Sequence, residues 1–385
     1  MKVFGIILEA NPFHYGHDYL IEHIRHTFQP DILIAITSTS FTMRGEISLL
    51  NKFEKTKILL NHQVDLVVEL PIFQTLQSAN GFAENAIEIL AQLGVTDIAF
   101  GSETADCLLY DKALSLLLDF EKSDFVLNQS MSLKQLFSNY LEQCSIPKSE
   151  IATINSPNFT LGLQYIYAIH KHQFSIQYHP ILRIGNQYHD KTITSSYASA
   201  SAIRELLYNK EDVSAYIPAD ISIQVDLAQA ENYLFALIEK VCWIDNLDLS
   251  SLFESNEGIP AYIIKCLNAS SVNSYPDLLC ILKNKKYTLN RMRRALLHIL
   301  LQTPKIIESQ TPYLRILGLN SQAKQYIRML PKQTKNYLFS SPKEMTSPNI
   351  HLLLELKATR LYSILIGQPN LYINEFKLPI RKETQ

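Results

Sequence analysis

Apolar residues follow two different patterns in the first half of the chain. Short continuous apolar runs bounded by polar residues are typical of buried strands, whereas apolar residues spaced three and four positions apart are typical of helices packed on one face. The predicted strands are Lys2–Leu8, Asp31–Thr37, Leu66–Glu69, Asp97–Phe100 and Ser175–Arg183. The predicted helices are His17–Thr27, Lys52–His62, Ala79–Leu93, the stretch from about Leu108 to Gln143, and Leu161–Lys171. Strands and helices alternate, so we expect an α/β fold in which a parallel sheet carries helices on both faces.

The pattern changes in the second half of the chain. Strand-like runs become rare after about residue 215, and helical periodicity dominates. The segments with that periodicity are Glu231–Trp243, Pro260–Leu267, Tyr275–Asn284, Asn290–Gln302 and His351–Leu365. The chain has 385 residues, whereas single cores rarely grow beyond about 300 residues. We therefore predict an α/β domain at 1–215 and a mainly α-helical domain at 216–385.

Composition narrows the class of protein. Hydrophobic residues make up 47% of the chain and aromatic residues 10%, which suits a sizeable core and not a disordered chain. The five cysteines are widely spaced and form no C-x-x-C pair, which argues against a disulfide framework or a zinc site. No run of about 18 apolar residues appears and a core strand begins at once, so we expect no membrane span, no signal peptide and a cytoplasmic location. The formal net charge of −2 excludes overall basicity but not a local basic face.

The most informative motif is H-x-G-H, formed by His14, Gly16 and His17 directly after the first strand. Asn11 and Pro12 end that strand, so the histidines fall where the next helix begins and exposes unpaired N–H groups. Such a helix end attracts phosphate, the glycine lets a ligand approach the backbone, and each imidazole can donate a hydrogen bond to a phosphoryl oxygen. The motif therefore indicates nucleotide chemistry.

Two other interpretations of the histidine pair stay open. Histidines three apart can bind a metal, although neither an H-E-x-x-H pattern nor a nearby cysteine pair completes a ligand set. They can also be ordinary surface histidines of a helix N-terminus. The preceding strand and the turn Asn11-Pro12-Phe13 weigh against this last interpretation.

Polar clusters follow several of the predicted strands. They are Ser38–Glu46, Gly101–Glu103, Ser156–Asn158, Leu182–Gly185 and Ser199–Arg204. Open α/β sheets bind ligands at the carboxyl ends of their strands, where the strand order reverses. Ser199, Ser201 and Arg204 place hydroxyls and a guanidinium at a second predicted helix start, which makes a second candidate anion site. The alternative there is an ordinary serine N-cap with a solvated arginine.

Taken in order, these motifs resemble a known family. The segments that carry the resemblance are Gly5–His17, Met43–Glu46, Asp65–Pro71, Phe100–Glu103, Ser199–Arg204 and Leu289–Arg294. The set is similar to the bacterial tRNA(Met) cytidine acetate ligase family, and H-x-G-H with a late S-x-S-x-I-R is similar to nucleotidyltransferases with a Rossmann-like fold of the class I synthetase type. The matches run from residue 3 to about residue 300. The chain departs from the family pattern at Ala10, Met43, Lys55 and Gln63-Val64, and none of these changes removes a candidate phosphate ligand.

The resemblance implies a ligase with a two-step reaction. ATP and acetate give acetyl-adenylate and pyrophosphate, and the acetyl group then passes to the wobble cytidine of elongator tRNA(Met), giving N4-acetylcytidine. The resemblance also implies that Mg²⁺ bridges the phosphates, that 1–215 binds ATP and that 216–385 binds tRNA. We predict no metal-ligating side chain and no protein partner.

The resemblance further assigns roles to residues. It implies that His14, His17 and Arg204 are catalytic. Arg204 is expected to bind the β- and γ-phosphates together with Ser199 and Ser201. The residues implied to bind ATP are Ile7, Leu8, Glu9, Asn11, Pro12, Phe13, Gly16, Gly101, Asn158, Arg183, Ile184, Ser199 and Ser201. Attack by the cytidine amine needs a base or careful positioning. The candidate bases, unranked, are Glu9, Glu46 and Glu103, and the alternative for each is a solvated or salt-bridged carboxylate.

Basic residues in the second half indicate where RNA would bind. The side chains predicted to contact tRNA cluster around Tyr287 and are Lys285, Lys286, Arg291, Arg293 and Arg294. A second basic stretch contains Lys324, Arg328, Lys332, Lys335 and Lys343. Such groups bind phosphates and make affinity depend on salt. The alternative for both stretches is a solvated helix face.

Two other functions remain compatible with the sequence. An adenylyltransferase on the same fold joins AMP to a small phosphorylated metabolite, although it needs neither this length nor a basic helical half. The second alternative is an RNA-binding protein that senses a nucleotide without catalysis. The presence of both histidines argues against this alternative. Acetate-dependent exchange between ATP and pyrophosphate separates all three.

Overall fold

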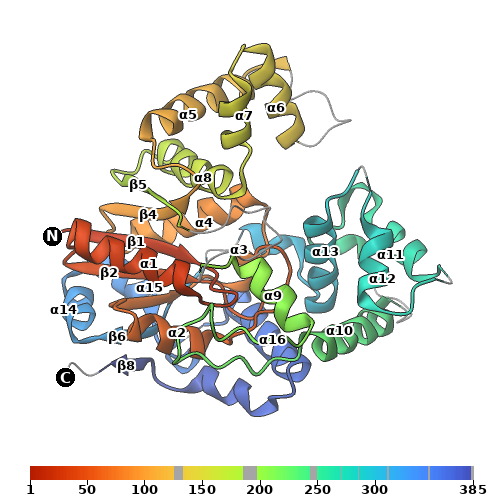
Figure 1. The fold of residues 1–385 in the computed structure, drawn as a ribbon. Coiled ribbons are helices and arrows are strands. Elements are labelled where there is room, and N and C mark those ends of the chain that lie inside the picture. The colour runs from red at the N-terminus through yellow and green to blue at the C-terminus, as the bar shows by residue number, and fades with distance from the viewer. Residues whose placement is uncertain are drawn as a thin grey trace.

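A mostly parallel sheet forms the centre of the protein. The computed structural model describes residues 1–124, 133–184, 197–242, 249–269, 271–284, 286–309, 312–345 and 347–382. The strands are β1 (Val3–Leu8), β2 (Ile32–Thr37), β3 (Leu66–Glu69), β4 (Asp97–Ser102), β5 (Gln177–Leu182), β6 (Leu314–Asn320), β7 (Leu338–Phe339) and β8 (Ile380–Lys382). They lie in the order β5-β4-β1-β2-β3-β6-β7, with β8 paired to β6 (Figure 1). Neighbours among β1 to β5 are parallel, and β6 runs antiparallel to β3.

The two faces of the sheet bury alternate residues of each strand. In β2, Ile34 and Ile36 pack on one face, whereas Leu33 and Ala35 pack on the other. Helices α4 (Ala79–Gln92) and α8 (Pro157–Lys171) cover the first face, and α1 (Tyr15–His23) and α2 (Lys52–Asn61) cover the second. Because successive side chains of a strand point to opposite faces, burial on both faces gives the continuous apolar runs seen in the sequence.

The strand order reverses between β1 and β4. From β1 the chain adds β2 and β3 on one side, and it then crosses over to add β4 and β5 on the other side. The loops that follow β1 and β4 therefore run in opposite directions and leave a crevice between them. In open α/β sheets this is the place where ligands bind.

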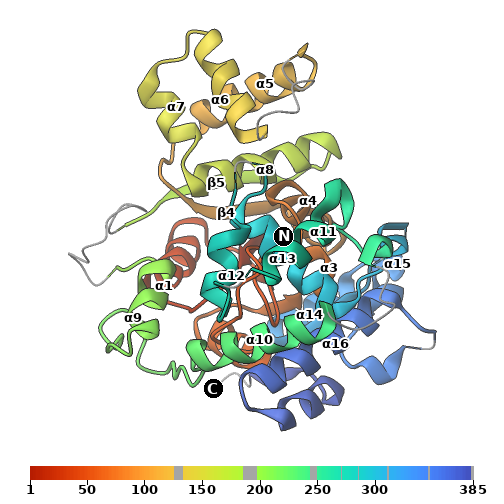
Figure 2. The same ribbon diagram turned by 90° about the vertical axis from the view of Figure 1, so that its right-hand side faces the viewer.

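Further helices surround the sheet. Helices α5 (Cys107–Glu121), α6 (Leu133–Gln143) and α7 (Lys148–Ile154) stand together beyond α8, at the top of Figure 1. Helices α10 (Leu227–Cys242), α11 (Ile259–Leu267), α12 (Tyr275–Leu282) and α13 (Leu289–Leu301) form a second group, which faces the viewer in Figure 2. Their apolar core also includes residues from elsewhere in the chain, such as Phe73, Leu354 and Tyr362. The remaining α-helices are α3 (Ile72–Thr75), α9 (Ala200–Tyr208), α14 (Ser321–Met329), α15 (Lys332–Tyr337) and α16 (Ile350–Leu365). No helix in the described ranges is both long and apolar enough to cross a membrane.

The α/β fold predicted from the sequence is confirmed, but the strands β6, β7 and β8 were not predicted. β6 interrupts the apolar pattern with Arg315 and Gly318, and it was not expected. The arginine is almost fully buried, and a Cβ on the glycine would lie 2.4 Å from Thr56 Cγ2 of α2. The sheet thus takes strands from both sides of residue 215. The domain boundary drawn there stays a prediction.

A buried ion cluster ties the C-terminal segment to the sheet. Lys52 Nζ of α2 contacts carboxylate oxygens of Glu69 at 2.6 Å, Glu355 at 3.0 Å and Glu375 at 2.7 Å. Arg315 of β6 pairs with two of the same carboxylates, Glu69 and Glu375. All five side chains are at most 2% exposed. Because a buried charge without a partner is very costly, these residues require one another.

Candidate active site

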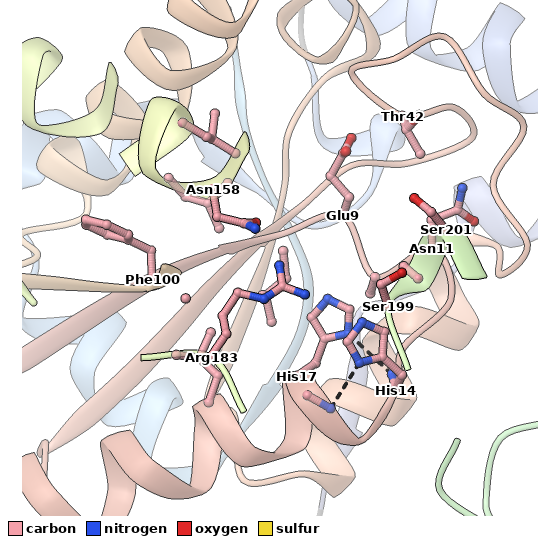
Figure 3. Close-up of a pocket in the computed structure, with 18 of the residues that line it drawn as sticks. Glu9, Asn11, His14, His17, Thr42, Phe100, Asn158, Arg183, Ser199 and Ser201 are labelled. Atoms are coloured by element: carbon pink, nitrogen blue, oxygen red, sulfur yellow. Dashed lines mark hydrogen bonds between the residues drawn. The ribbon is translucent and has the colours of Figure 1, made fainter. Parts of the chain in front are cut away.

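A pocket of about 240 Å³ opens at the carboxyl ends of β1 and β4. Its walls come from the loop between β1 and α1, the 42–46 loop, the first turns of α4 and α8, the end of β5 and the start of α9. The residues implied to bind ATP or act in catalysis all line it, except Pro12 and Phe13. Figure 3 shows side chains from these separate segments gathered around one space.

The two histidines of the H-x-G-H motif are fixed by the backbone at the start of α1. His14 is the N-cap, and its Nδ1 accepts a hydrogen bond from the Gly16 N–H at 3.0 Å. His17 Nδ1 accepts one from the His14 N–H at 3.3 Å, and the ring centroids lie 3.9 Å apart (Figure 3). Because each Nδ1 is an acceptor, the proton of each neutral imidazole sits on Nε2. The pair therefore offers two Nε2–H donors.

Both imidazoles are neutral at physiological pH. Burial, aided by the positive charges of Arg183 and Lys55, lowers the pKa of His17 to about 3. Burial also lowers the pKa of His14 well below its usual value, with His17 and the nearby arginines adding to the effect. A neutral pair donates hydrogen bonds without supplying charge. The positive charge that phosphates need must come from the arginines of the pocket.

Gly16 and Phe13 hold the histidine pair in place. A Cβ on Gly16 would lie 2.8 Å from Cε1 and 3.0 Å from Nδ1 of His14, so only glycine leaves room for this cap. The fully buried Phe13 ring stacks on His17 with centroids 5.4 Å apart. Pro12 and Phe13 are not among the residues that line the pocket, and their direct contact with ATP stays a prediction. Phe13 supports His17 from behind.

A second helix N-terminus, that of α9, faces the same pocket. Ser199 is its N-cap, and the Ser199 Oγ accepts a hydrogen bond from the Ala202 N–H at 3.2 Å. Arg204 donates from Nη2 to Ser201 Oγ at 3.2 Å and from Nη1 to the Asn11 carbonyl at 2.8 Å. These bonds hold α9 against the loop that carries the histidines, so two anion-binding helix ends meet in one site.

The 42–46 loop connects the pocket to α13. Glu46 accepts from Arg204 Nη2 at 3.1 Å and from Arg293 Nη1 of α13 at 3.2 Å. Gly45 has φ +73°, and a Cβ there would lie 2.8 Å from Arg293 Cβ and 2.9 Å from its carbonyl carbon. The loop therefore packs directly on the α13 backbone. One carboxylate is shared between an arginine of the pocket and an arginine of the helical half.

The other end of the pocket suits a nucleobase. Gly101 at the end of β4 faces Arg183, and a Cβ on the glycine would lie 3.3 Å from Arg183 Cγ. Asn158, in the first turn of α8, donates its Nδ2 to Glu103 Oε1 at 2.8 Å. Its side-chain oxygen is then the atom available to a ligand. Figure 3 shows Asn158 and Arg183 on opposite sides of this end.

The three carboxylates named as candidate bases differ in their contacts. Glu103 accepts from the backbone N–H groups of Asn158 at 3.2 Å and Phe159 at 2.8 Å, so it caps α8. Burial alone would raise the pKa of Glu103, but hydrogen bonds from the Asn158 and Ser156 side chains and from the Asn158 N–H bring it below its usual value. Glu46 is held by two arginines. The structure therefore explains Glu103 and Glu46 as structural carboxylates.

Glu9, the third candidate, uses only one of its two carboxylate oxygens in a hydrogen bond within the described part of the chain. Its Oε1 accepts from the Met43 N–H at 2.6 Å, and no group in the described part of the chain hydrogen-bonds to Oε2. Burial raises the pKa of Glu9, although the charges of Arg44 and Lys55 oppose this. Lys55 itself is buried, and its Nζ donates to the Ser38 carbonyl at 3.0 Å behind the pocket. Among the three candidates, Glu9 is the one placed to accept a proton.

The donor set of the pocket does not form a magnesium site by itself. Mg²⁺ is usually held by one or two carboxylates besides phosphate oxygens and water. The carboxylates among the described lining residues are Glu9, beside Met43, and Glu46, between its two arginines. Magnesium therefore stays a prediction without support from these residues. Elsewhere Glu84, Glu88 and His172 converge outside the pocket, but a lysine already pairs with Glu84.

The basic residues predicted to bind tRNA differ in exposure. Lys285 lies outside the described residues. Lys286 is exposed, with its Nζ 5.0 Å from the centre of the Tyr287 ring, and Arg291 Cζ lies 5.6 Å from the same ring. Arg293 is committed to Glu46.

Arg294 does not fit the expected surface role. It is 8% exposed and pairs with Glu254 at 3.3 Å. This burial and pairing do not favour a direct phosphate contact, which stays a prediction. Arg294 fastens α13 to the segment that carries Glu254.

Several lining residues were missed by sequence analysis. Phe82, Leu161 and Tyr165 line the pocket from α4 and α8. In the sequence they look like ordinary core positions of amphipathic helices, which is why they carry no separate signal. Leu161 and Tyr165 follow Asn158 by three and seven residues, which places all three on one helix face. That spacing is the signal by which they can be found.

Comparison with known proteins agrees with this geometry. The family model for HIGH nucleotidyl transferases matches residues 1–375. A tRNA(Met) cytidine acetate ligase of Caldicellulosiruptor saccharolyticus is 33% identical over 98% of each chain, and one of Staphylococcus saprophyticus is 32% identical over 99% of each. The chain belongs to the tRNA(Met) cytidine acetate ligase family. The family expected from the motifs is thereby confirmed.

Solved structures support the same assignment. Thermotoga maritima TmcAL without ligand matches over the whole of both chains, with a TM-score of 0.87 and 27% identity. The same protein bound with alpha-thio ATP matches with a TM-score of 0.83 and 26% identity, again over the whole of both chains. The fold of the tRNA(Met) cytidine acetate ligase family therefore extends over the helical half as well as the sheet.

Proposed function

We propose that the protein is an ATP-dependent tRNA(Met) cytidine acetate ligase, which activates acetate as acetyl-adenylate and acetylates the wobble cytidine of elongator tRNA(Met). The observation that carries this proposal is the His14–His17 pair, whose Nδ1 atoms are held by backbone N–H groups so that both Nε2 protons are left for phosphate. The names of the relatives and the alpha-thio ATP complex of T. maritima TmcAL support it.

In the first step a carboxylate oxygen of acetate attacks the α-phosphorus of ATP. The new O–P bond forms while the bond to the β-phosphate oxygen breaks, and pyrophosphate leaves with the electron pair. Negative charge grows on the phosphoryl oxygens, and donors already aimed there are the main catalytic resource. We assign this role to Nε2–H of His14 and His17. Arg204 and the N-terminus of α9 hold the leaving β- and γ-phosphates.

The adenosine half of ATP is assigned to the end of the pocket at β4 and β5. There the Asn158 side-chain oxygen accepts a hydrogen bond from the adenine amino group, since its amide nitrogen is already bound to Glu103. Gly101 lets the base approach the strand backbone. Arg183 and Ile184 cover the base from the segment after β5, where both line the pocket.

In the second step the cytidine N4 attacks the acetyl carbon. An N–C bond forms, the C–O bond to the phosphate breaks, AMP leaves with the electron pair, and N4 gives up one proton. We assign that proton to Glu9 Oε2. A carboxylate whose pKa is raised toward neutrality is a better proton acceptor than an ordinary one.

The tRNA is assigned to the side of the molecule formed by α12 and α13. The exposed cations there are Lys283 and Lys286, with Arg291 on the first turn of α13. Arg293 connects this side to the pocket through Glu46. Phosphate contacts of this kind give affinity without sequence preference, so binding is expected to weaken as salt rises.

The test is ATP–pyrophosphate exchange with and without acetate, followed by addition of tRNA. The ligase exchanges label only when acetate is present and transfers acetyl to tRNA afterwards. A metabolite adenylyltransferase would need its own acceptor, and a nucleotide-sensing RNA-binding protein would show no exchange. Either of these outcomes would overturn the proposal.

A further inference from the structure

One region of the pocket, next to the part assigned to the nucleobase, is walled by apolar side chains. Phe82 of α4 and Leu161 and Tyr165 of α8 lie there together with Phe100 and belong to the core on that face of the sheet. The rings of Phe100 and Tyr165 meet edge on, with centroids 5.7 Å apart. A ligand in this region would have carbon on several sides.

A buried hydroxyl faces this apolar region without a partner in the described part of the chain. Tyr165 is 3% exposed and lines the pocket, and no group in the described part of the chain hydrogen-bonds to its hydroxyl. Burial and the neighbouring charge of Glu9 raise the pKa of Tyr165, so the hydroxyl remains protonated and is a donor. Because Tyr165 borders the pocket, a hydroxyl that makes no hydrogen bond within the described part of the chain can donate to a ligand there. A hydroxyl in this state indicates a ligand that accepts its hydrogen bond.

The geometry points to this region of the pocket as the acetate subsite, with the methyl group against Phe82 and Leu161 and a carboxylate oxygen bonded to the Tyr165 hydroxyl. This inference rests on the proposed function and adds the subsite to it. A short carboxylate matches both features, since it carries one small apolar group and one strong acceptor. Arg44, which lines the same pocket, adds positive charge for the anion.

The subsite also fits the second step. Once acetate has become acetyl-adenylate, the Tyr165 hydroxyl donates to the acetyl carbonyl oxygen, where negative charge grows as N4 attacks. Glu9, the proposed base, lines the same pocket as Tyr165. Tyr165 is thus placed to act in both steps, and the apolar wall limits the length of the acyl chain.

The first test is Tyr165→Phe, which removes only the hydroxyl. Acetate-dependent ATP–pyrophosphate exchange is expected to show a KM for acetate raised by about 10- to 100-fold, as for loss of a hydrogen bond to a charged group, with the KM for ATP unchanged within about twofold. The matched control is Tyr167→Phe on the same helix, whose hydroxyl bonds to the exposed Glu121 instead. An unchanged KM for acetate in Tyr165→Phe would overturn the inference.

The second test is Leu161→Ala, which lengthens the apolar region. The preference for acetate over propionate is expected to fall by about tenfold, because one methylene in an apolar pocket is worth at least that factor. The control is Leu163→Ala, since Leu163 is buried in the core of the same helix but does not line the pocket. If both variants lose the preference for acetate over propionate equally, the change comes from general loosening of the helix packing. The proposed subsite would then not determine the acyl length.

Binding separates failure of the subsite from failure of the proposed function. The probe is a non-hydrolysable acetyl-sulfamoyl adenosine, compared with its propionyl homologue by calorimetry. Weaker binding of the acetyl probe to Tyr165→Phe than to the wild-type protein supports the subsite, whether or not the wild-type protein exchanges pyrophosphate. Absence of exchange in the wild-type protein would contradict only the ligase proposal. Equal binding to the wild-type protein and Tyr165→Phe overturns the subsite even if the ligase is active.

Discussion

At the scale of single residues, the missing side chain of Gly16 leaves room for the His14 ring to cap α1 beside His17. A Cβ there would push into the His14 ring that caps α1, at 2.8 Å from Cε1. Gly16→Ala is therefore expected to lower the rate of acetate-dependent exchange by about 100-fold or more, the usual effect of losing a donor to the transition state. The control is Gly81→Ala in the first turn of α4, where the added Cβ meets only the flexible Gln77 side chain at 3.1 Å. Wild-type exchange in Gly16→Ala would contradict the assignment.

The low pKa of His17 predicts how stability depends on pH. The unfolded chain binds a proton at this histidine below about pH 6.5, whereas the native protein does not until about pH 3. The unfolded state thus binds more protons, and the free energy of unfolding falls as the pH is lowered. Between pH 6 and pH 5 the fall is expected to be about 1 kcal/mol smaller in His17→Gln than in the wild type. Urea unfolding at both pH values measures it, and identical falls would show that His17 is not buried neutral.

In the proposed mechanism Glu9 acts as a base in the second half-reaction and not in the first. Glu9→Gln keeps an oxygen for the Met43 N–H but cannot take a proton. We expect acetyl transfer to tRNA to slow by about 100- to 10,000-fold, the usual contribution of a general base. Acetate-dependent exchange is expected to stay within about tenfold of wild type, because the histidines and Arg204 are intact. Single-turnover transfer from preformed acetyl-adenylate measures the difference, and unimpaired transfer would remove Glu9 from the mechanism.

At the scale of elements, the contact between the 42–46 loop and α13 joins the two halves of the chain. Gly45→Ala would force both a left-handed φ and a collision with the Arg293 backbone. We expect a loss of about 2–4 kcal/mol in the free energy of unfolding. Gly367→Ala has a similar φ, +68°, but open space around the added carbon, so it is expected to cost only about 1 kcal/mol. Equal losses in urea unfolding would show that the loop does not depend on α13.

The same elements show what the sequence can and cannot predict. Strands buried on both faces and helices with a clear stripe were found within a few residues, and H-x-G-H located one wall of the pocket because its pattern is local. β6 was missed because Arg315, buried by ion pairs to residues far along the chain, looks like a surface residue in its own segment. The burial of Arg294 was missed for the same reason. Tyr165 was not selected because a tyrosine facing a pocket and one facing a core have the same spacing.

At the scale of the whole molecule, the buried ion cluster holds the C-terminal segment to the sheet. Lys52→Met would leave Glu69, Glu355 and Glu375 without their shared cation, at an expected cost of about 3–5 kcal/mol. Burial already raises the pKa of Glu355 to about 7 against the pull of Lys52, so protonation should relieve part of the loss at pH 5. The exposed pair Lys112–Glu150 supplies the control, and Lys112→Met is expected to cost less than about 1 kcal/mol. Comparable costs in thermal or urea unfolding would contradict this role of the cluster.

The most direct test of the central claim is nucleoside mass spectrometry of elongator tRNA(Met) after incubation with the protein, ATP and acetate. The proposed function predicts N4-acetylcytidine at the wobble position, present only when all components are supplied and absent with His17→Ala. No acetylcytidine from protein that binds ATP would contradict it, and the H-x-G-H pocket would then belong to a different transfer reaction.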